Sequence, residues 1–528
     1  MASAEFPRPR ETERIPENFW GKVERLQERG NYVSLGLDSD WSQIPQEYKV
    51  LGREEGQFQF NKDIIDGTHD LVCTYKPNLS FYFDSEEGER ALKRTVDYIH
   101  QAYPGIPVLA DDKLGDIGNT NDGWVRMLFD RFDFDATTVS PYMGGEALRP
   151  FLEQKNKGIV VVCKTSNPGG GEFQDLQVPI DDFTSDVQEK IELMRISGGT
   201  KIPVYMAVAN RVSKHWNRVS NNCGLVVGAT YPEQAEQIRE IDPRMQFLVP
   251  GVGAQGADLQ KAVATSMNVN NGGIVVNSSR AIIFARREQL VGGEIESVGQ
   301  AARRETLKLH DEINYYREHP EGFTPSQEQL AHAFFDHDVL MFGEFTLKLH
   351  ETNPTAPLSP VYVDQRILRS APNDVKTLAC LVIQQVIRDL KFDVYADTPT
   401  AITPLVSLLS YLADIPMITP RGEKTHGSGA IIDGKYEPGK TVALALDDVI
   451  TSGASANEAV DKLRSAGVIV KDFVAFVNRE QGGIQAIKAN DVNPHWVYDL
   501  SNLLRFYKRT GRITKATYNR CVNYFKNA

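Results

Sequence analysis

Eight short apolar segments recur in the first half of the chain, with helix-like stretches between them, and this repetition restricts the possible folds more than any other feature. Strands that alternate with helices pair in parallel, because each helix returns the chain to the edge where the previous strand began. Such units fill close to the roughly 250 residues of a (β/α)8 barrel. We therefore predict an α/β fold with an N-terminal (β/α)8 TIM barrel, and a doubly wound sheet is the alternative. The expected strands are Tyr32–Leu37, Leu71–Tyr75, Pro107–Ala110, Ala136–Val139, Gly158–Cys163, Gly224–Val227, Gln246–Val249 and Gly273–Val276.

The composition is that of a globular chain with more than one domain. Its 528 residues exceed the usual size of a single domain, and its hydrophobic fraction of 41% is ordinary for soluble proteins. The net charge of −12 argues against nonspecific nucleic-acid binding, whereas a local basic pocket can still bind a small anion. We expect small-molecule substrates, no nucleic acid and no membrane.

The N-terminus and the cysteines bear on the compartment. The first residues lack the apolar core of a secretory signal, and no stretch reaches the roughly 18 apolar residues of a membrane span. The five cysteines lie far apart and form no C-x-x-C pair, so we expect neither a disulfide framework nor a zinc site. These features predict a cytoplasmic protein.

A charged motif, D-x-K-x-x-D, follows the third expected strand. In an extended segment Asp111 and Lys113 point to the same side, and Asp116 lies in the loop just beyond. Charges at the end of a buried strand are costly unless they pair. A structural ion network and a reactive site both contain charged groups with perturbed pKa values. The motif is therefore compatible with either.

Polar residues also follow the other strands, where a barrel places its chemistry. Asp38 follows the first strand, Lys76 ends the second, and Ser166 lies in a glycine-rich loop after the fifth. The loops after the seventh and eighth strands carry Gln255 and Arg280 beside glycines whose N–H groups can approach an anion. These last two loops predict a phosphate site.

The stretches DDKLGDIGNT, LGLDSD, KTSNPGGGEFQ, VVGAT, VPGVGAQG and SSRAI resemble orotidine 5′-monophosphate decarboxylase over roughly residues 15–320. The resemblance implies a barrel dimer, with sites at the subunit interface and no cofactor. It also implies the following roles: Lys113 as proton donor to C6, Asp111 and the partner subunit's Asp116 beside it, Lys76 completing the charge array, Asp38 and Thr120 at the ribose, Ser166 at the pyrimidine, and Gln255, Arg280 and the Ser279 N–H at the phosphate.

The chemistry of these residue types is compatible with decarboxylation. Loss of CO2 leaves an electron pair on a ring carbon, and a lysine ammonium placed there stabilises it and then delivers the proton. A D-x-K-x-x-D barrel can instead belong to relatives that act on sugar phosphates with a divalent metal. Asn119, Thr120 and the Ser166 loop favour the nucleotide.

The second half has its own charged motif at the end of an apolar strand. Asp447 and Asp448 are followed by a loop of small residues and then by a helical pattern, and Ser455 with Glu458 fits a capping box. Loop N–H groups at a helix N-terminus favour an anion, while the acids suit a diol or a hydrated metal ion. An ordinary strand-to-helix turn is the alternative. The loop consists of Thr451, Ser452, Gly453, Ala454 and Ser455.

This motif resembles the phosphoribosyl pyrophosphate loop of orotate phosphoribosyltransferases, together with FGEFTLK, SPVYVDQR, RGEKTHG and NREQGG, over roughly residues 328–505. The resemblance implies a type I phosphoribosyltransferase, with an open parallel sheet, a catalytic loop and Mg²⁺. It also implies these roles: Asp447 and Asp448 at the ribose hydroxyls, Thr451 to Ser455 at the 5′-phosphate, Lys348, Tyr362 and Arg479 near orotate or the sugar donor, and Arg421, Lys424 and His426 at pyrophosphate, with Lys424 the main catalytic cation.

One departure from this family concerns the catalytic loop. Gly422 stands where the family usually has lysine, and the loop is one residue shorter, which removes a cation expected at pyrophosphate. The segment after FGEFTLK is also longer than usual. A regulatory or assembly module that binds phosphoribosyl pyrophosphate, with only the barrel catalytic, is therefore the alternative for this half.

The two resemblances predict two catalytic domains in one chain. The expected domains are a decarboxylase barrel over 1–320, a linker over 321–330 marked by Gly322 and Pro325, and a transferase over 331–528. The tail from Phe506 to Ala528 is expected to be an amphipathic helix without a function of its own. Such a chain converts orotate and phosphoribosyl pyrophosphate to UMP through orotidine 5′-monophosphate, as a homodimer or larger homo-oligomer.

Overall fold

The chain forms two compact units, Met1–Pro320 and Glu321–Ala528. The structure is a computed structural model that describes residues 18–252, 258–290, 293–346, 350, 353, 355–399, 401–421 and 431–527. In these residues no helix combines the length and apolar character that crossing a bilayer requires.

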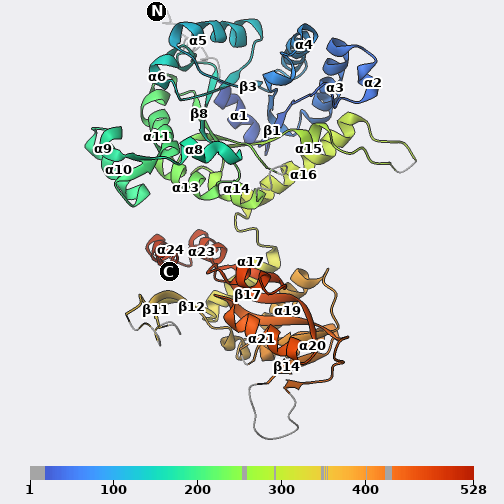
Figure 1. Ribbon diagram of the computed structural model, residues 1–528. Helices are drawn as coiled ribbons and strands as arrows, with labels where there is room; N and C mark the ends of the chain where they lie inside the picture. The colour runs from blue at the N-terminus through green and yellow to red at the C-terminus, as the bar shows by residue number, and fades with distance from the viewer. Residues whose placement is uncertain are drawn as a thin grey trace, which may run out of the picture. The chain divides into compact units, whose positions relative to one another are not determined.

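The first unit is an eight-stranded parallel barrel (Figure 1). The strands run in the order β2-β1-β10-β9-β8-β5-β4-β3, and isolated bridges from Tyr75 to Val108 and from Asn78 to Asp111 bring β2 and β3 together. The predicted barrel is confirmed, and each expected strand is found to within a few residues. The strands are β1 Val33–Gly36, β2 Val72–Lys76, β3 Leu109–Leu114, β4 Ala136–Val139, β5 Gly158–Lys164, β8 Cys223–Val227, β9 Gln246–Val249 and β10 Ile274–Ser278.

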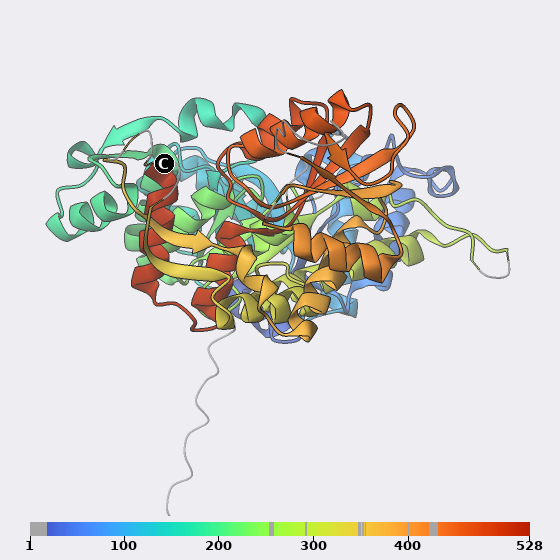
Figure 2. The same cartoon turned by 90° about the horizontal axis from the view of Figure 1, so that it is seen from below.

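Helices surround the barrel, and one insertion projects from it. The insertion lies between β5 and β8; it contains the antiparallel pair β6 Gln177–Pro179 and β7 Lys201–Pro203, and it stands out at the left of both views (Figure 1, Figure 2). The helices are α1 Phe19–Gln27, α2 Gln46–Lys49, α3 Arg53–Thr68, α4 Glu86–Ala102, α5 Gly118–Val125, α6 Gly144–Ala147, α7 Arg149–Leu152, α8 Gly171–Gln174, α9 Ile180–Phe183, α10 Val187–Ser197, α11 Val204–Arg211, α12 Asn217–Ser220, α13 Pro232–Ile241, α14 Leu259–Ser266, α15 Arg280–Ile283 and α16 Val298–Glu318. Short 3₁₀ or π turns are η1 Leu79–Phe81, η2 Arg126–Arg131, η3 Pro168–Gly170 and η4 Val212–Trp216.

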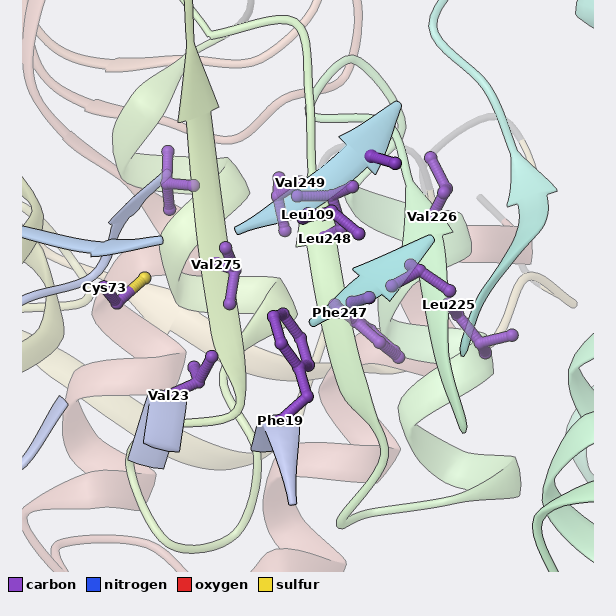
Figure 3. Close-up of a cluster of buried hydrophobic side chains, with 14 of the residues drawn as sticks. Phe19, Val23, Cys73, Leu109, Leu225, Val226, Phe247, Leu248, Val249 and Val275 are labelled. Atoms are coloured by element: carbon purple, nitrogen blue, oxygen red, sulfur yellow. The ribbon is translucent and has the colours of Figure 1, made fainter. Parts of the chain in front are cut away.

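The amino ends of the barrel strands are closed by α1. Figure 3 shows Phe19 directed among the core side chains of the barrel strands, close to Phe247. The fit needs glycine in two strands, because a Cβ at Gly158 would lie 2.3 Å from Phe19 and one at Gly224 would lie 2.3 Å from Trp20. With its amino end filled, the barrel offers its carboxyl end for chemistry.

The second unit is a three-layer α/β structure. Alternate residues of β16 face opposite helical layers, because side chains of a strand alternate in direction. Leu444 and Leu446 pack with α17, α19, α20 and α23, whereas Ala443 and Ala445 pack with α21 and α22. The strands are β11 Leu340–Phe345, β12 Ser359–Val363, β13 Val394–Asp397, β14 Met417–Pro420, β15 Ile432–Asp433, β16 Val442–Ile450, β17 Ile469–Asn478 and β18 Asn493–Asp499, and the helices are α17 Pro325–Asp336, α19 Asn373–Ile387, α20 Thr403–Ala413, α21 Ala454–Ser465, α22 Gly483–Lys488, α23 Leu500–Arg509 and α24 Lys515–Asn527, with the 3₁₀ turn η5 Gln365–Arg369.

The six-stranded sheet of this unit is mixed rather than purely parallel, which corrects the expectation of an open parallel sheet. Its order is β15-β14-β13-β16-β17-β18. Five strands pair in parallel, but the two-residue β15 pairs antiparallel with β14. The reason is local: β15 follows β14 without a crossover helix among the described residues, so the chain returns alongside the same strand.

The expected linker over 321–330 is wrong. Phe323 and Leu330 are buried in the core of the second unit, and α17 begins at Pro325 with a capping box from Thr324 and Gln327. Pro325 occupies the first helical turn, where proline is tolerated, so the Pro and Gly residues here mark a helix start rather than a tether.

Candidate active site

The carboxyl ends of β2 and β3 bring two lysines onto one carboxylate. Lys76 Nζ lies 2.5 Å from Asp111 Oδ2, and Lys113 Nζ binds Asp111 Oδ1. Lys76 is 3% exposed, whereas the Lys113 side chain is 47% exposed. The Asp111 carboxylate thus holds the buried Lys76 ammonium group, while the Lys113 ammonium group remains accessible to a ligand.

Burial and charge act in opposite directions on this cluster. Burial alone would raise the pKa of Asp111, but the two ammonium groups outweigh it and hold that pKa well below its usual range. Burial alone would lower the pKa of Lys76, but the attraction of Asp111 and Asp38 leaves it above the usual value. Both groups are therefore charged at neutral pH.

The backbone at Lys113 is unusual. Lys113 has φ +51°, and the pairing of β3 with β4 is irregular between Ala110 and Leu114. A lysine in the left-handed region costs about 1 kcal/mol or more. Asp111 and Lys113 therefore meet through a bulge, whereas the expected strand ended at Ala110 and assumed regular alternation. The Thr138 hydroxyl supports the bulge by accepting the N–H groups of Asp112 and Lys113 at 3.0 and 2.9 Å.

Neighbouring strand ends complete one side of this space. Asp38 acts electrostatically on Lys76, and its buried Oδ1 has no hydrogen-bond partner in the structure. A Cβ at Gly36 would lie 1.9 Å from Ser279 Oγ, so the ends of β1 and β10 approach closely. Ser279 directly precedes α15, and Arg280 is its exposed first residue.

The Ser166 loop is held at the end of β5. A Cβ at Gly228 would lie 2.8 Å from the Ser166 N atom, so the loops after β5 and β8 touch. Lys164, which the sequence interpretation left without a role, is fully buried and binds Asp175 at 2.6 Å. Its ammonium also lies 4.3 Å from the Tyr231 ring centroid. These contacts tie both ends of the loop to the barrel.

Among the described residues, two expected site residues form no hydrogen bond or ion pair with Lys76 or Lys113. Asp116 and Thr120 are exposed, and Asp116 Oδ1 accepts the Ile117 N–H at 2.7 Å. Gln255, the other expected phosphate ligand, lies outside the described residues.

Comparison with known proteins identifies this barrel. Residues 32–294 match the model of the orotidine 5′-phosphate decarboxylase / HUMPS family. Orotidine 5′-phosphate decarboxylase of Cellvibrio japonicus is 40% identical over 285 residues, which cover 93% of that protein and 54% of this chain. The chain belongs to the orotidine 5′-phosphate decarboxylase family. The enzyme of this name from Azoarcus sp. is also 40% identical, over 291 residues that cover 96% of it and 55% of this chain.

The decarboxylase match ends before the second unit. A solved structure of Leishmania donovani UMP synthase is 30% identical and covers 97% of this chain and 100% of its own, with a TM-score of 0.48. The decarboxylase family accounts for the first unit and for a reaction of pyrimidine biosynthesis.

Outside the decarboxylase barrel, the second unit places two acids side by side in β16. Asp447 is 6% exposed, and its Oδ1 accepts the Asp448 N–H at 2.8 Å. Burial first, and then the charge of the neighbouring acid, raises the pKa of Asp447 well above its usual range; burial also raises that of Asp448. Asp397 at the end of β13 is buried nearby and accepts the hydroxyls of Thr403 and Thr419.

The loop after these acids turns sharply into α21. Gly453 has φ +79°, and a Cβ there would lie 2.8 Å from Gly483 O. The expected capping box of Ser455 and Glu458 is wrong, because α21 begins at Ala454 and Gly453 occupies the N-cap without a side-chain hydrogen bond. The left-handed turn places the N-cap two residues earlier than Ser455 and leaves the first N–H groups free of a side-chain cap.

Arg479 lies beneath the C-terminal helix. It is 7% exposed, and its Nε is buried without a hydrogen-bond partner in the structure. Burial lowers its pKa, and the nearby Tyr524 and Tyr362 oppose that shift. Its guanidinium carbon is 5.6 Å from the Phe525 ring centroid, and α24 packs against β12, as Figure 2 shows for the red helix and yellow strands. The expected closing helix at the tail therefore borders a candidate site residue.

The expected pyrophosphate residues are only partly placed. Arg421 follows β14 and binds Asp433, whereas Gly422, Lys424 and His426 lie outside the described residues, as does Lys348, which was expected near orotate or the sugar donor. Among the described residues no group of three or more His, Cys, Asp or Glu side chains could hold a metal ion. Two adjacent carboxylates fit Mg²⁺ only where a ligand's phosphates supply further oxygens, as this ion commonly requires.

Proposed function

We propose that the chain is bifunctional, and that it makes orotidine 5′-monophosphate in its second unit and decarboxylates it in its first. The decarboxylase is given by family membership. The observation that carries the transferase is the pair of buried Asp447 and half-buried Asp448 near the carboxyl end of β16, which is followed by the Gly453 turn and the N-terminus of α21. This arrangement can bind a sugar diol and a phosphate side by side.

In the decarboxylase, Lys113 is proposed to be the catalytic cation. The C6–carboxylate bond breaks, CO2 leaves, and the electron pair on C6 takes a proton from the Lys113 ammonium. Asp111 holds that ammonium, and the buried Lys76 fixes Asp111 from the other side. Because Lys113 is preorganised, its charge costs little reorganisation in the transition state.

The remaining decarboxylase residues are proposed to bind the parts of the nucleotide that do not react. Asp38 and Thr120 bind the ribose, Ser166 the pyrimidine, and Gln255, Arg280 and the Ser279 N–H the phosphate. Binding energy at the phosphate can be used at the reacting carbon. No metal or organic cofactor is proposed for this step.

We propose a dimer in which the partner subunit's Asp116 completes the cluster. Asp116 is exposed, and it is surrounded in sequence and at the neighbouring strand end by exposed apolar side chains. Ile117 is 53% exposed, Tyr142 86% and Met143 47%. Large apolar side chains exposed beside a charged site are typical of an interface.

In the transferase, Asp447 and Asp448 are proposed to bind the ribose hydroxyls and Thr451–Ser455 the 5′-phosphate of phosphoribosyl pyrophosphate. Lys348, Tyr362 and Arg479 bind orotate or the sugar donor, and Arg421, Lys424 and His426 bind pyrophosphate. Mg²⁺ supplies charge neutralisation for the pyrophosphate when bound. The catalytic residue of this set is Lys424.

A binding module is the second candidate for this unit, because Gly422 removes a cation from the catalytic loop. Such a module would bind phosphoribosyl pyrophosphate without releasing pyrophosphate.

Paired variants test the bifunctional proposal. Lys113→Ala, given orotate, phosphoribosyl pyrophosphate and Mg²⁺, is expected to accumulate orotidine 5′-monophosphate. Lys424→Ala is expected to make none, yet to decarboxylate the nucleotide when it is supplied. Decarboxylation by Lys113→Ala would refute the role of Lys113, and pyrophosphate release by Lys424→Ala at the wild-type rate would refute that of Lys424.

A further inference from the structure

Asp112 lies between the two central residues of the decarboxylase cluster, and the proposed reaction leaves it without a role. Its Oδ1 accepts the Thr137 hydroxyl at 2.8 Å. Its Oδ2 is buried and has no hydrogen-bond partner in the structure. A half-satisfied buried carboxyl group is costly when ionised, so its presence beside a reactive cluster calls for a physical reason.

The Thr138 hydroxyl connects Asp112 to this cluster. It accepts the backbone N–H groups of Asp112 and Lys113, at 3.0 and 2.9 Å, and these occupy its two lone pairs. Its single proton can then go to Asp111 Oδ1 at 3.4 Å or to Asp112 Oδ1 at 3.3 Å. Two carboxyl groups therefore compete for one donor, and the one with the greater negative charge receives it.

We propose that Asp112 is a positioning residue of the decarboxylase that acts through Thr138. Neutral Asp112 leaves the Thr138 hydroxyl to Asp111, which then has three donors and is fixed under Lys113. Ionised Asp112 draws the hydroxyl away and adds a second negative charge beside Asp111. The inference rests on the roles proposed above for Asp111 and Lys113.

The surroundings of Asp112 bring its ionisation close to neutral pH. Burial, and next the charge of Asp111, raises the pKa of Asp112 to about 7, although the hydrogen bonds from Thr137 and Thr138 oppose the shift. The charged group that faces it is Asp111 on β3, which itself binds Lys113 and, on β2, Lys76; from β4 the hydroxyls of Thr137 and Thr138 face it.

The charge change has a predictable sign. While Asp112 is neutral, the Lys76 and Lys113 ammonium groups balance the carboxylates of Asp111 and Asp38. Ionisation of Asp112 adds one net negative charge, and the substrate brings its own carboxylate and phosphate. We therefore expect KM for orotidine 5′-monophosphate to rise as pH increases from 7 to 9, by roughly tenfold for one added charge in a partly buried site.

The test measures kcat and KM of the full chain from pH 7 to 9, above the range in which the substrate phosphate titrates. Asp112→Asn keeps an acceptor for Thr137 but cannot ionise, so its KM is expected to stay near the wild-type pH 7 value throughout. Asp130→Asn, which neutralises an exposed acid, is the matched control and should keep the wild-type profile. A wild-type rise in KM that persists in Asp112→Asn would overturn the inference.

Thr138 provides a second, independent pair of variants. Thr138→Val removes the shared hydroxyl, and we expect a higher KM at every pH with a weaker pH dependence; Thr138→Ser should restore the wild-type profile. Equal losses in kcat/KM at all pH values for Asp112→Asn would show a merely structural residue and refute the inference. Activity in Lys113→Ala would instead refute the proposed roles of the cluster, so the two failures are distinguishable.

Discussion

At the scale of single residues, Lys76 and Lys113 bind the same carboxylate but differ in burial, and we expect this difference to give their variants different stabilities. The Lys76 side chain is 4% exposed and that of Lys113 47%. Lys76→Met leaves Asp111 buried without its inner partner, so we expect a loss of about 3 kcal/mol in the free energy of unfolding together with lost decarboxylation. Lys113→Met should cost about 1 kcal/mol or less while abolishing decarboxylation.

Urea unfolding and CO2 release measured on both variants check this pair of expectations. Equal stabilities of the two variants would show that burial of Lys76 does not anchor Asp111.

The acid pair Asp447–Asp448 predicts a pH dependence at the other site. Because burial raises both pKa values, and the charge of Asp448 raises that of Asp447 further, part of the pair is protonated at neutral pH. Ribose hydroxyls and Mg²⁺ favour the ionised form, so binding must release protons. We expect Kd for Mg²⁺–phosphoribosyl pyrophosphate to fall as pH rises from 6 to 8, measured by calorimetry in buffers of different ionisation enthalpy. Asp447→Asn should bind more weakly and with less dependence on pH; an unchanged profile would contradict the proposed role of this acid.

At the scale of elements, the loops after β5 and β8 touch, so we expect one methyl group added at this contact to weaken substrate binding. Gly228→Ala places a Cβ 2.8 Å from the Ser166 N atom, and backbone cannot move aside as a side chain can. We expect the Ser166 loop to shift and KM for orotidine 5′-monophosphate to rise severalfold. Gly105→Ala is the control, because nothing lies within 4 Å of its Cβ. Equal KM values for the two variants would show that the loop contact does not position Ser166.

The contact of the C-terminal helix α24 with Arg479 leads us to expect that the tail contributes to the proposed transferase site. Phe525 lies over the buried Arg479, which is a proposed ligand of orotate or the sugar donor. Phe525→Ala opens Arg479 to water and weakens its attraction for an anion, so we expect KM for orotate to rise while decarboxylation stays unchanged. Tyr411→Ala, at an 82% exposed aromatic residue in α20, is the control. A wild-type KM for Phe525→Ala would remove α24 from the site.

The same elements show how far sequence reasoning reaches. The eight barrel strands were predictable because each is a buried run between helical stretches, and Lys76, Asp111 and Lys113 were predictable because they end such runs. The bulge at Lys113 was not, because the Thr138 hydroxyl that supports it comes from another strand. The same holds for Lys164, whose partners Asp175 and Tyr231 are set by tertiary contacts. At α21 the sequence offered a capping box, but the contact between Gly453 and Gly483 fixed the helix start instead.

At the scale of the whole molecule, the chain has two units with separate cores, each with its own cluster of charged residues. The family match covers only the first unit, so the claim that two successive reactions share one chain depends on the chemistry of the second. If each site is complete within its own unit, apart from the partner subunit's Asp116, a substitution in one cluster should leave the other reaction at its wild-type rate.

The most direct test supplies the purified full chain with orotate labelled in its carboxyl carbon, phosphoribosyl pyrophosphate and Mg²⁺, and measures labelled CO2, pyrophosphate and the nucleotide formed. We predict UMP, with one CO2 and one pyrophosphate released for each orotate consumed. If no pyrophosphate and no labelled CO2 appear, while orotidine 5′-monophosphate supplied directly is decarboxylated, the second unit is not a transferase and the bifunctional proposal is wrong.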